Sequence, residues 1–270
     1  MPTKRPQRPI PTSRINDTAE YRTIPVDLAS KHNAEPLVSV EDFGVASDPY
    51  YWRSDGTNPP YYRRLPGSDP VVRVRASVAR RLAAVNRRLM PHDVELVALD
   101  GFRSLTCQRA LWSHFMRQAR RAAPGIPLAR LERSVLRYVS DPRRFSADDP
   151  RTWPTHLTGA AVDVTLRTRS TRELVFMGGV FDDASAISHT ARYERTDPHN
   201  SLSSILARQN RRLLYWAMMA EDFVNLPTEW WHFDWGTQLW ALSRRARHRR
   251  VRALYGPAAA GFEENPGVIA

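Results

Sequence analysis

Two short segments, far apart in the chain, carry side chains that could together hold a metal ion and hydrolyse a substrate. The first segment contains His156 and Asp163, and the second reads Glu-Trp-Trp-His over residues 229–232. A hydrolytic zinc site needs three protein ligands, an open position for water and a general base. Two imidazoles and two carboxylates are enough for that set. These residues therefore indicate zinc-dependent hydrolysis.

The surroundings of Asp163 strengthen this interpretation. The residue interrupts an otherwise apolar run, residues 160–164, that is typical of a buried strand. A carboxylate buried in such a strand is costly unless it is paired or binds a metal ion. Gly159 permits a close backbone approach between His156 and this strand. Metal coordination would therefore explain both the carboxylate and the neighbouring imidazole.

The spacing of Glu229 and His232 sets a geometric condition. On a regular strand, residues i and i+3 face opposite sides, so both side chains could not reach one metal ion. We therefore expect a bulge or a strong twist in this segment. The alternative is that Glu229 stands at the end of the strand, where Pro227 redirects the chain.

The remaining chain supplies the elements that must position these side chains. Apolar spacing predicts helices over residues 71–89, from near Ser104 onward, and over 127–139, 201–220 and 237–254. Strands are predicted over 94–99, 160–166, 229–235 and, as an edge strand, 173–176. Strands and helices are interspersed without a regular alternation, which indicates an α+β fold.

Composition bounds the organisation of the chain. Residues 1–35 are basic and proline-rich and are interpreted as a flexible leader, followed by one domain over 36–255 and a tail over 256–270. No apolar run is long enough to span a membrane, and the leader lacks the apolar stretch of a secretory signal. These features predict a cytoplasmic protein. Cys107 is the only cysteine, so an intrachain disulfide is excluded.

The net charge of +12 raises the question of nucleic-acid binding. The densest arginine cluster lies over residues 244–252 and could hold an anionic surface. No recognised nucleic-acid-binding motif accompanies it, and arginine is scattered through every predicted helix. A solvated basic face is therefore the preferred interpretation, and no specific nucleic-acid partner is predicted.

Four motifs, taken in order, resemble a known family. They are Asp-Gly-Phe-Arg at 100–103, Thr-His-x-x-Gly-x-Ala-x-Asp at 155–163, Met-Gly-x-x-Phe-Asp at 177–182 and Glu-Trp-Trp-His-Phe at 229–233. This set resembles the zinc D-alanyl-D-alanine dipeptidases, whose wider clan includes D,D-carboxypeptidases and the hedgehog signalling domain. The resemblance implies a small central, mainly antiparallel sheet flanked by helices.

The resemblance also implies a role for each site residue. It implies three Zn²⁺ ligands: His156, Asp163 and His232. Glu229 corresponds to the general base that takes a proton from the attacking water and passes it to the leaving amine. Arg103 corresponds to the group that stabilises the oxyanion, and Asp182 to the group that holds the ammonium of the dipeptide.

Two positions depart from the family pattern. Ser104 stands where proline usually follows the motif arginine, and Pro154 stands where a serine commonly lies two residues before the first ligand. Pro154 offers no hydroxyl for a substrate hydrogen bond. These departures affect the identity of the substrate more than the hydrolytic chemistry.

The sequence therefore predicts a zinc dipeptidase that cleaves D-Ala-D-Ala or a similar D,D-dipeptide. A D,D- or L,D-carboxypeptidase acting on peptidoglycan stem peptides is the second enzyme hypothesis. A third hypothesis is a non-catalytic zinc-binding interaction module, against which the presence of both Glu229 and Arg103 argues, since a structural zinc site needs neither.

Overall fold

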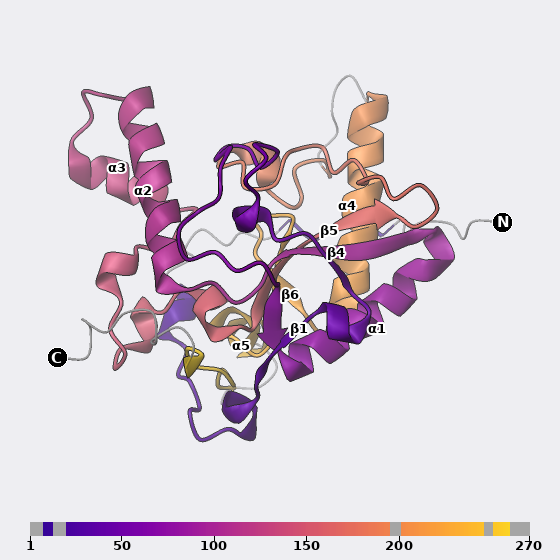
Figure 1. Cartoon of the computed structure of the whole chain (residues 1–270), viewed down its shortest axis with the longest axis horizontal. Coiled ribbons are helices and arrows are strands. Elements are labelled where there is room, and N and C mark those ends of the chain that lie inside the picture. The colour runs from indigo at the N-terminus through magenta and orange to yellow at the C-terminus, as the bar shows by residue number, and fades with distance from the viewer. Residues whose placement is uncertain (1–7, 13–19, 195–200, 246–250, 260–270) are drawn as a thin grey trace.

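The molecule is built on a five-stranded sheet with helices at both ends (Figure 1). The computed structural model describes residues 8–12, 20–194, 201–245 and 251–259. The strand order is β2-β4-β5-β7-β6, and only the β2–β4 pairing is parallel. Their bounds are β2 Ala46–Ser47, β4 Val94–Asp100, β5 Ala161–Thr168, β6 Val224–Asn225 and β7 His232–Asp234. The α+β class with a mainly antiparallel sheet is confirmed.

Two groups of helices flank this sheet. The helix α1, Ala76–Leu89, packs against β4 and against α4, Leu202–Ala220. The helices α2, Leu105–Ala122, and α3, Leu128–Val135, pack together at the other end of the molecule (Figure 1). A fifth helix, α5, covers Gln238–Arg245. The buried apolar side chains of the sheet, α1, α2 and α4 form one large core.

Local sequence explains where the two central helices begin and end. In α1 the apolar residues Val78, Leu82, Val85 and Leu89 are fully buried, at the spacing that places them on one face. The helix starts later than predicted, because Arg73–Arg75 forms β3, which pairs with β1, Leu37–Ser39. The side chain of Ser104 caps α2 by accepting a hydrogen bond from the backbone of Cys107 at 3.1 Å.

Three further predicted elements differ from the structure. The predicted helix over 127–139 ends at Val135, and the predicted edge strand over 173–176 is reduced to one bridge between Leu174 and Arg167. The predicted helix over 237–254 ends at Arg245, and residues 246–250 lie outside the described residues. Ala253 instead pairs with Val26, so tertiary pairing replaces the helix at that point.

A segment near the N-terminus returns to the body of the molecule. Residues 20–34 are predicted to belong to a flexible leader, and in the structure they contact the last described part of the chain. Ile24 is buried with Ala241 and Ala253, and the side chain of Gln238 donates to the carbonyl oxygen of Arg22 at 2.9 Å. These contacts hold Arg22 beside the site described below.

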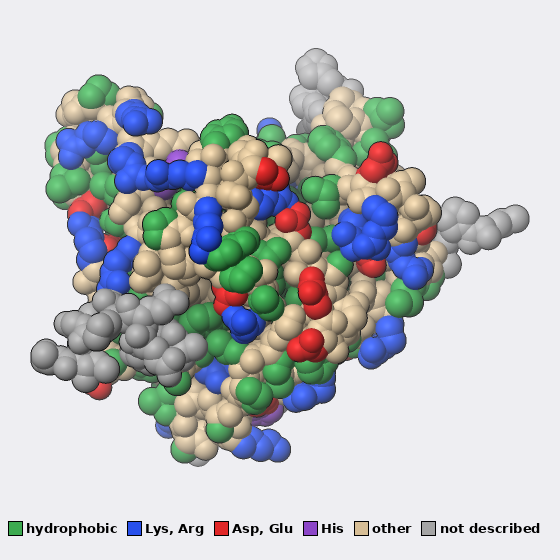
Figure 2. Space-filling view, viewed as in Figure 1, with side chains coloured by type: hydrophobic (Ala, Val, Ile, Leu, Met, Phe, Trp, Pro, Cys, Tyr) green, Lys and Arg blue, Asp and Glu red, His purple; other side chains and the backbone are tan. Residues whose placement is uncertain are grey.

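Among the described residues, no helix combines the length and the apolar character that crossing a bilayer requires. The space-filling view shows Lys and Arg side chains gathered over α2 and α3 (Figure 2). Most of the arginine cluster over residues 244–252 falls outside the described residues, so its nucleic-acid interpretation stays untested.

Candidate active site

The centre of the site is assembled by three neighbouring strands. Asp163 of β5 lies directly opposite His232 of β7 on one side and Asp100 of β4 on the other. The register shifts by one residue between Ala98 and Asp100, which is a bulge in β4. Because directly opposed residues project from the same face of a sheet, the bulge places all three polar side chains on one face.

His156 enters from the turn that precedes β5. It lies in a short 3-10 helix, Thr155–Thr158, and Gly159 ends that helix with a φ of 69°. A Cβ atom at Gly159 would lie 2.3 Å from the side chain of Leu37, so glycine is required there both by backbone conformation and by space. This sharp turn brings the imidazole of His156 back over the start of β5.

Three potential ligand atoms converge at this point. His156 Nε2 lies 3.1 Å from His232 Nδ1, and Asp163 Oδ1 lies 3.0 Å from His232 Nδ1 and 3.5 Å from His156 Nε2. Tetrahedral ligands about 2.1 Å from a zinc ion lie about 3.4 Å from one another. The three separations match that geometry closely, and all three residues are buried. The arrangement therefore fits a zinc ion.

The outer nitrogen of each imidazole has an acceptor of its own. His156 Nδ1 donates to the carbonyl oxygen of Gly101 at 2.8 Å, and His232 Nε2 lies 3.4 Å from Asp234 Oδ2. A proton on each outer nitrogen leaves the inner nitrogen with its lone pair directed at the site. Asp234 is fully buried, and neither of its carboxylate oxygens has a hydrogen bond from another described residue. Asp234 follows the Glu-Trp-Trp-His-Phe motif directly but was not among the predicted site residues.

Glu229 lies just outside the strand that carries His232. The strand β7 begins at His232, so the predicted strand over 229–235 is too long at its start. A turn precedes it, in which the backbone of His232 donates to the carbonyl oxygen of Glu229 at 3.3 Å. The side chain of Asn225 donates to the same carbonyl at 3.0 Å. Of the alternatives predicted for this segment, the structure has Glu229 before the strand.

The turn brings the carboxylate of Glu229 to the ligand cluster. Its Oε2 atom lies 3.7 Å from His232 Nδ1. Burial raises the pKa of Glu229 to about 8, with a smaller contribution from the neighbouring carboxylates of Asp163 and Asp182 and an opposing one from His232. Burial alone would also raise the pKa of Asp163, but the two adjacent imidazoles lower it well below the usual carboxyl range. The two carboxylates thus differ strongly in proton affinity.

Arg103 closes one side of the cluster. Its guanidinium contacts Asp100 Oδ2 at 2.8 Å and Asp163 Oδ2 at 3.3 Å, and its backbone N–H donates to the carbonyl oxygen of His156 at 3.2 Å. Further hydrogen bonds join it to the hydroxyl of Tyr51 and to Gln108 Oε1, each at 3.2 Å. These contacts hold the planar guanidinium of Arg103, with its five N–H donors, in a fixed position beside the three potential metal ligands.

Asp182 lies on the same side, beyond Tyr51. Its Oδ2 atom accepts hydrogen bonds from the hydroxyls of Tyr51 at 2.8 Å and Tyr61 at 2.5 Å. Burial raises the pKa of Asp182, and the two tyrosine hydrogen bonds counteract that rise. The backbone at Asp182 has a φ of 65°, which a non-glycine residue rarely adopts. Neither tyrosine belongs to one of the four sequence motifs.

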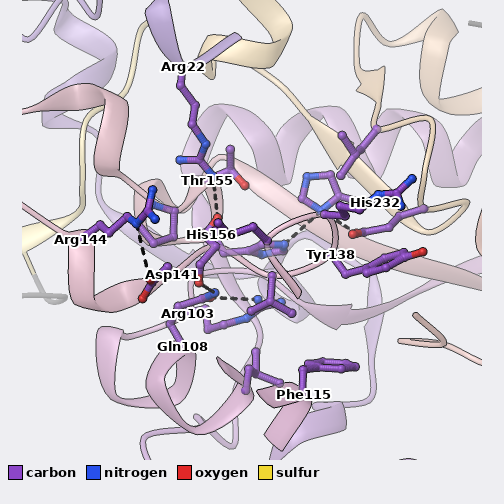
Figure 3. A pocket seen from close by; sticks show the side chains of 18 of the residues that line it. Arg22, Arg103, Gln108, Phe115, Tyr138, Asp141, Arg144, Thr155, His156 and His232 are labelled. Carbon is purple, nitrogen blue, oxygen red and sulfur yellow. Dashed lines mark hydrogen bonds and ion pairs between the residues drawn. The ribbon is translucent and has the colours of Figure 1, made fainter. Parts of the chain in front are cut away.

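The candidate site opens into one cavity of about 430 Å³ (Figure 3). The six residues singled out by the sequence motifs line it together: Arg103, His156, Asp163, Asp182, Glu229 and His232. Figure 3 shows His156 and His232 close together, with Arg103 and Gln108 beside them. The arrangement can bind a metal ion, present a carboxylate beside it, and direct a guanidinium toward a developing negative charge.

Comparison with known proteins identifies the family. The family model described as D-Ala-D-Ala dipeptidase matches residues 71–251, which is more than half of the chain. A D-alanyl-D-alanine dipeptidase of Synechocystis sp. is 30% identical over 249 residues, covering 87% of this chain and 95% of that protein. One from Streptomyces coelicolor is 32% identical over 138 residues, covering 51% and 60%. The chain belongs to the D-Ala-D-Ala dipeptidase family. It is a zinc metallopeptidase, as the resemblance of its motifs implies.

Two solved structures also align with the chain. One is a variant of the vancomycin-resistance D,D-pentapeptidase VanY in complex with Zn(II), at 13% identity and a TM-score of 0.38, covering 70% of this chain and 86% of that one. The other is VanYB in complex with D-alanine-D-alanine, at 14% identity and a TM-score of 0.40, covering 72% and 88%.

Proposed function

We propose that this protein hydrolyses D-Ala-D-Ala or a similar D,D-dipeptide in the cavity that contains the two histidines. The observation that carries the proposal is the convergence of three ligand atoms beside a buried glutamate and a fixed guanidinium. A site that only stabilises a fold needs a closed set of four ligands. Here three ligand atoms face an open cavity, as hydrolysis requires.

The metal ligands in this proposal are His156, Asp163 and His232. A zinc ion bound there lowers the pKa of a coordinated water toward about 7 and polarises the scissile carbonyl. Glu229 accepts the proton of the attacking water and delivers it to the leaving amine. Burial raises the pKa of Glu229 in the metal-free protein, and the positive charge of a bound zinc ion would oppose that rise.

Arg103 stabilises the negative charge that develops on the carbonyl oxygen. Replacing Arg103 with lysine should lower kcat by about 10²–10³-fold, the range found when a fixed oxyanion donor is lost. Lysine keeps the positive charge, but its single ammonium group cannot contact Asp100, Gln108 and Tyr51 at the same time as the planar guanidinium does. Steady-state rates combined with zinc analysis test this expectation. A variant that changes KM alone would place Arg103 in substrate binding instead.

Asp182 binds the ammonium group of the substrate. A buried carboxylate held by two tyrosine hydroxyls supplies an anion to pair with that group. The site should therefore require a free N-terminus, which separates a dipeptidase from a carboxypeptidase acting on stem peptides. The second activity needs no free amine at this position.

A dipeptide panel tests the proposed function. Purified zinc-loaded protein is incubated with D-Ala-D-Ala, L-Ala-L-Ala and N-acetyl-D-Ala-D-Ala, with and without chelator, and products are separated by chromatography. We expect chelator-sensitive cleavage of D-Ala-D-Ala and little cleavage of the acetylated peptide. Efficient cleavage of the acetylated peptide would favour the carboxypeptidase. Absence of any cleavage would favour a non-catalytic zinc-binding module.

Asp234 orients His232 in this proposal. Replacing Asp234 with asparagine should weaken zinc binding by about 10–100-fold, because a neutral acceptor holds the outer nitrogen of His232 less firmly. Competition with a chromogenic chelator measures the affinity. An Asp42→Asn variant is the control, since Asp42 is an exposed carboxylate outside the cavity. Equal affinity in the two variants would remove Asp234 from the metal site.

We also propose a cytoplasmic location, on the composition of residues 1–35. A dipeptidase placed there would act on free D,D-dipeptides before they enter cell-wall precursors. Fractionation of cells expressing the full chain tests the location, and recovery in an exported fraction would contradict it.

A further inference from the structure

One wall of the cavity is cationic and lies beyond the residues proposed for catalysis. Four arginines line it: Arg22, Arg137, Arg144 and Arg151. Arg137, Arg144 and Arg151 come from the segment between α3 and the 3-10 helix that contains His156. Arg22 comes from the N-terminal segment that packs against this region. Figure 3 shows Arg22 and Arg144 on this wall, with His156 beyond them. D-Ala-D-Ala carries no charge besides its termini, so this wall offers more positive charge than that substrate needs.

Two of these arginines have an acidic partner and two do not. Arg144 shares Asp141 with Arg143, and Arg151 pairs with Asp149 at 2.8 Å. The guanidinium of Arg22 donates to neutral acceptors, the carbonyl oxygen of Trp153 at 2.8 Å and the hydroxyl of Ser140 at 2.6 Å. Within the described part of the chain, neither Arg22 nor Arg137 forms an ion pair with an acidic side chain.

A chain of hydrogen bonds fixes Arg22 relative to the catalytic groups. Ser140 accepts from Arg22 through its hydroxyl, and its carbonyl oxygen accepts from Gln108 Nε2 at 3.0 Å. Gln108 Oε1 in turn accepts from Arg103 Nη1 at 3.2 Å. The half-buried guanidinium of Arg22 is thus held in place, although it is supplied by a segment far away in sequence.

The same network indicates which end of a substrate faces this wall. Arg103 contacts Tyr51, which donates to Asp182, on one side, and Gln108, which leads to Arg22, on the other. If Asp182 holds the ammonium group, the C-terminal residue of the dipeptide extends past Arg103 toward Arg22. Arg22 is also bound to the carbonyl of Trp153, directly before Pro154, where the family's serine hydroxyl is missing.

We propose that the C-terminal residue of the preferred dipeptide carries an acidic side chain, as in D-Asp or D-Glu, and that Arg22 and Arg137 bind its two carboxylates. One carboxylate needs one cation, and the wall presents two that lack an acidic partner. The basic surface over α2 and α3 adds a positive field that draws anionic ligands toward this end of the molecule (Figure 2). This inference rests on the proposed function, since it takes the orientation of the dipeptide from Asp182.

The test compares two peptides that differ only in this charge. Zinc-loaded Glu229→Gln protein is titrated calorimetrically with D-Ala-D-Glu and with D-Ala-D-Gln, which is close in shape but neutral. We expect D-Ala-D-Glu to bind about tenfold or more tightly, because its ionised carboxylate forms charge-assisted hydrogen bonds with the guanidinium groups that the neutral amide cannot form. The preference should fall on addition of Arg22→Met, and also on addition of Arg137→Met, whose exposed side chain makes a folding defect unexpected. Arg87→Met, an exposed arginine on α1, is the matched control.

Each result decides a different claim. Equal binding of the two peptides, or a preference that survives in both Arg22→Met and Arg137→Met, overturns the inference. Cleavage of D-Ala-D-Gln by the unmodified enzyme without a charge preference overturns the inference but leaves the proposed function intact. A charge preference in binding without cleavage of any dipeptide supports the charge selectivity and contradicts the proposed function.

Discussion

Replacing Glu229 with glutamine should lower kcat by about 10²–10⁴-fold while the zinc content stays unchanged. Glutamine has nearly the same shape but cannot accept the proton of the attacking water. The Glu229 side chain precedes β7 and lies 3.7 Å from His232 Nδ1, farther than the three ligand atoms lie from one another. The change should therefore remove proton transfer and leave the ligands in place.

Two measurements on the same preparation test this expectation. Elemental analysis gives zinc per chain, and a D-Ala-D-Ala assay gives kcat. Glu173→Gln is the matched control, because Glu173 is exposed and lies outside the cavity. Loss of zinc in Glu229→Gln would make Glu229 a ligand, and an unchanged kcat would assign the proton transfer to another group.

The motif spacing predicted that His156 and Asp163 lie close together, because the geometry that joins them is mostly local. His156 and Asp163 are separated by one tight turn and the first residues of a strand, so their meeting depends on Gly159 and on strand alternation alone. The position of Asp163 within an apolar run was also a local signal, and it indicated a buried carboxylate that needs a partner. The pairing with His232 is not local, since it depends on β5 and β7 lying side by side.

Residues that act through long-range contacts could not be found in this way. Tyr51 and Tyr61 come from an irregular segment without periodicity, and only the folded chain brings their hydroxyls to Asp182. Arg22 lies in a segment whose composition resembles that of a flexible leader. Its position depends on Gln238 and Ser140, more than a hundred residues away in sequence.

The boundaries of elements were wrong where tertiary pairing competed with helical spacing. The predicted start of the first helix at residue 71 ignored the pairing of Arg73–Arg75 with Leu37–Ser39. The predicted last helix continued through a region where Ala253 pairs with Val26. Helical periodicity is a weak signal when a neighbouring strand can satisfy the same backbone groups. These errors did not affect the predicted site, because neither boundary contains one of the predicted metal ligands.

Replacing His232 with alanine should empty the metal site and abolish hydrolysis. The change removes one of three ligands and leaves Asp163 and Asp234 buried without the imidazole that lies between them. A ligand present at 1,000 times its dissociation constant stabilises a native protein by about 4 kcal/mol. Zinc should therefore raise the Tm of the unmodified protein and have little effect on the variant. Elemental analysis after dialysis and thermal unfolding with and without chelator measure the two effects.

Thermal unfolding in chelator separates loss of the metal from loss of the fold. The variant should keep a cooperative unfolding transition in chelator, at a Tm below that of the unmodified protein in chelator, because Asp163 and Asp234 lose a buried partner. His92→Ala is the control, because His92 lies in the turn after α1 and outside the cavity. Full zinc occupancy in His232→Ala would contradict the assignment, since the two remaining ligands, one imidazole and one carboxylate, provide too few donors to retain zinc through dialysis. His232 would then be a neighbour of the metal, and a carboxylate such as Glu229 would have to be its third ligand.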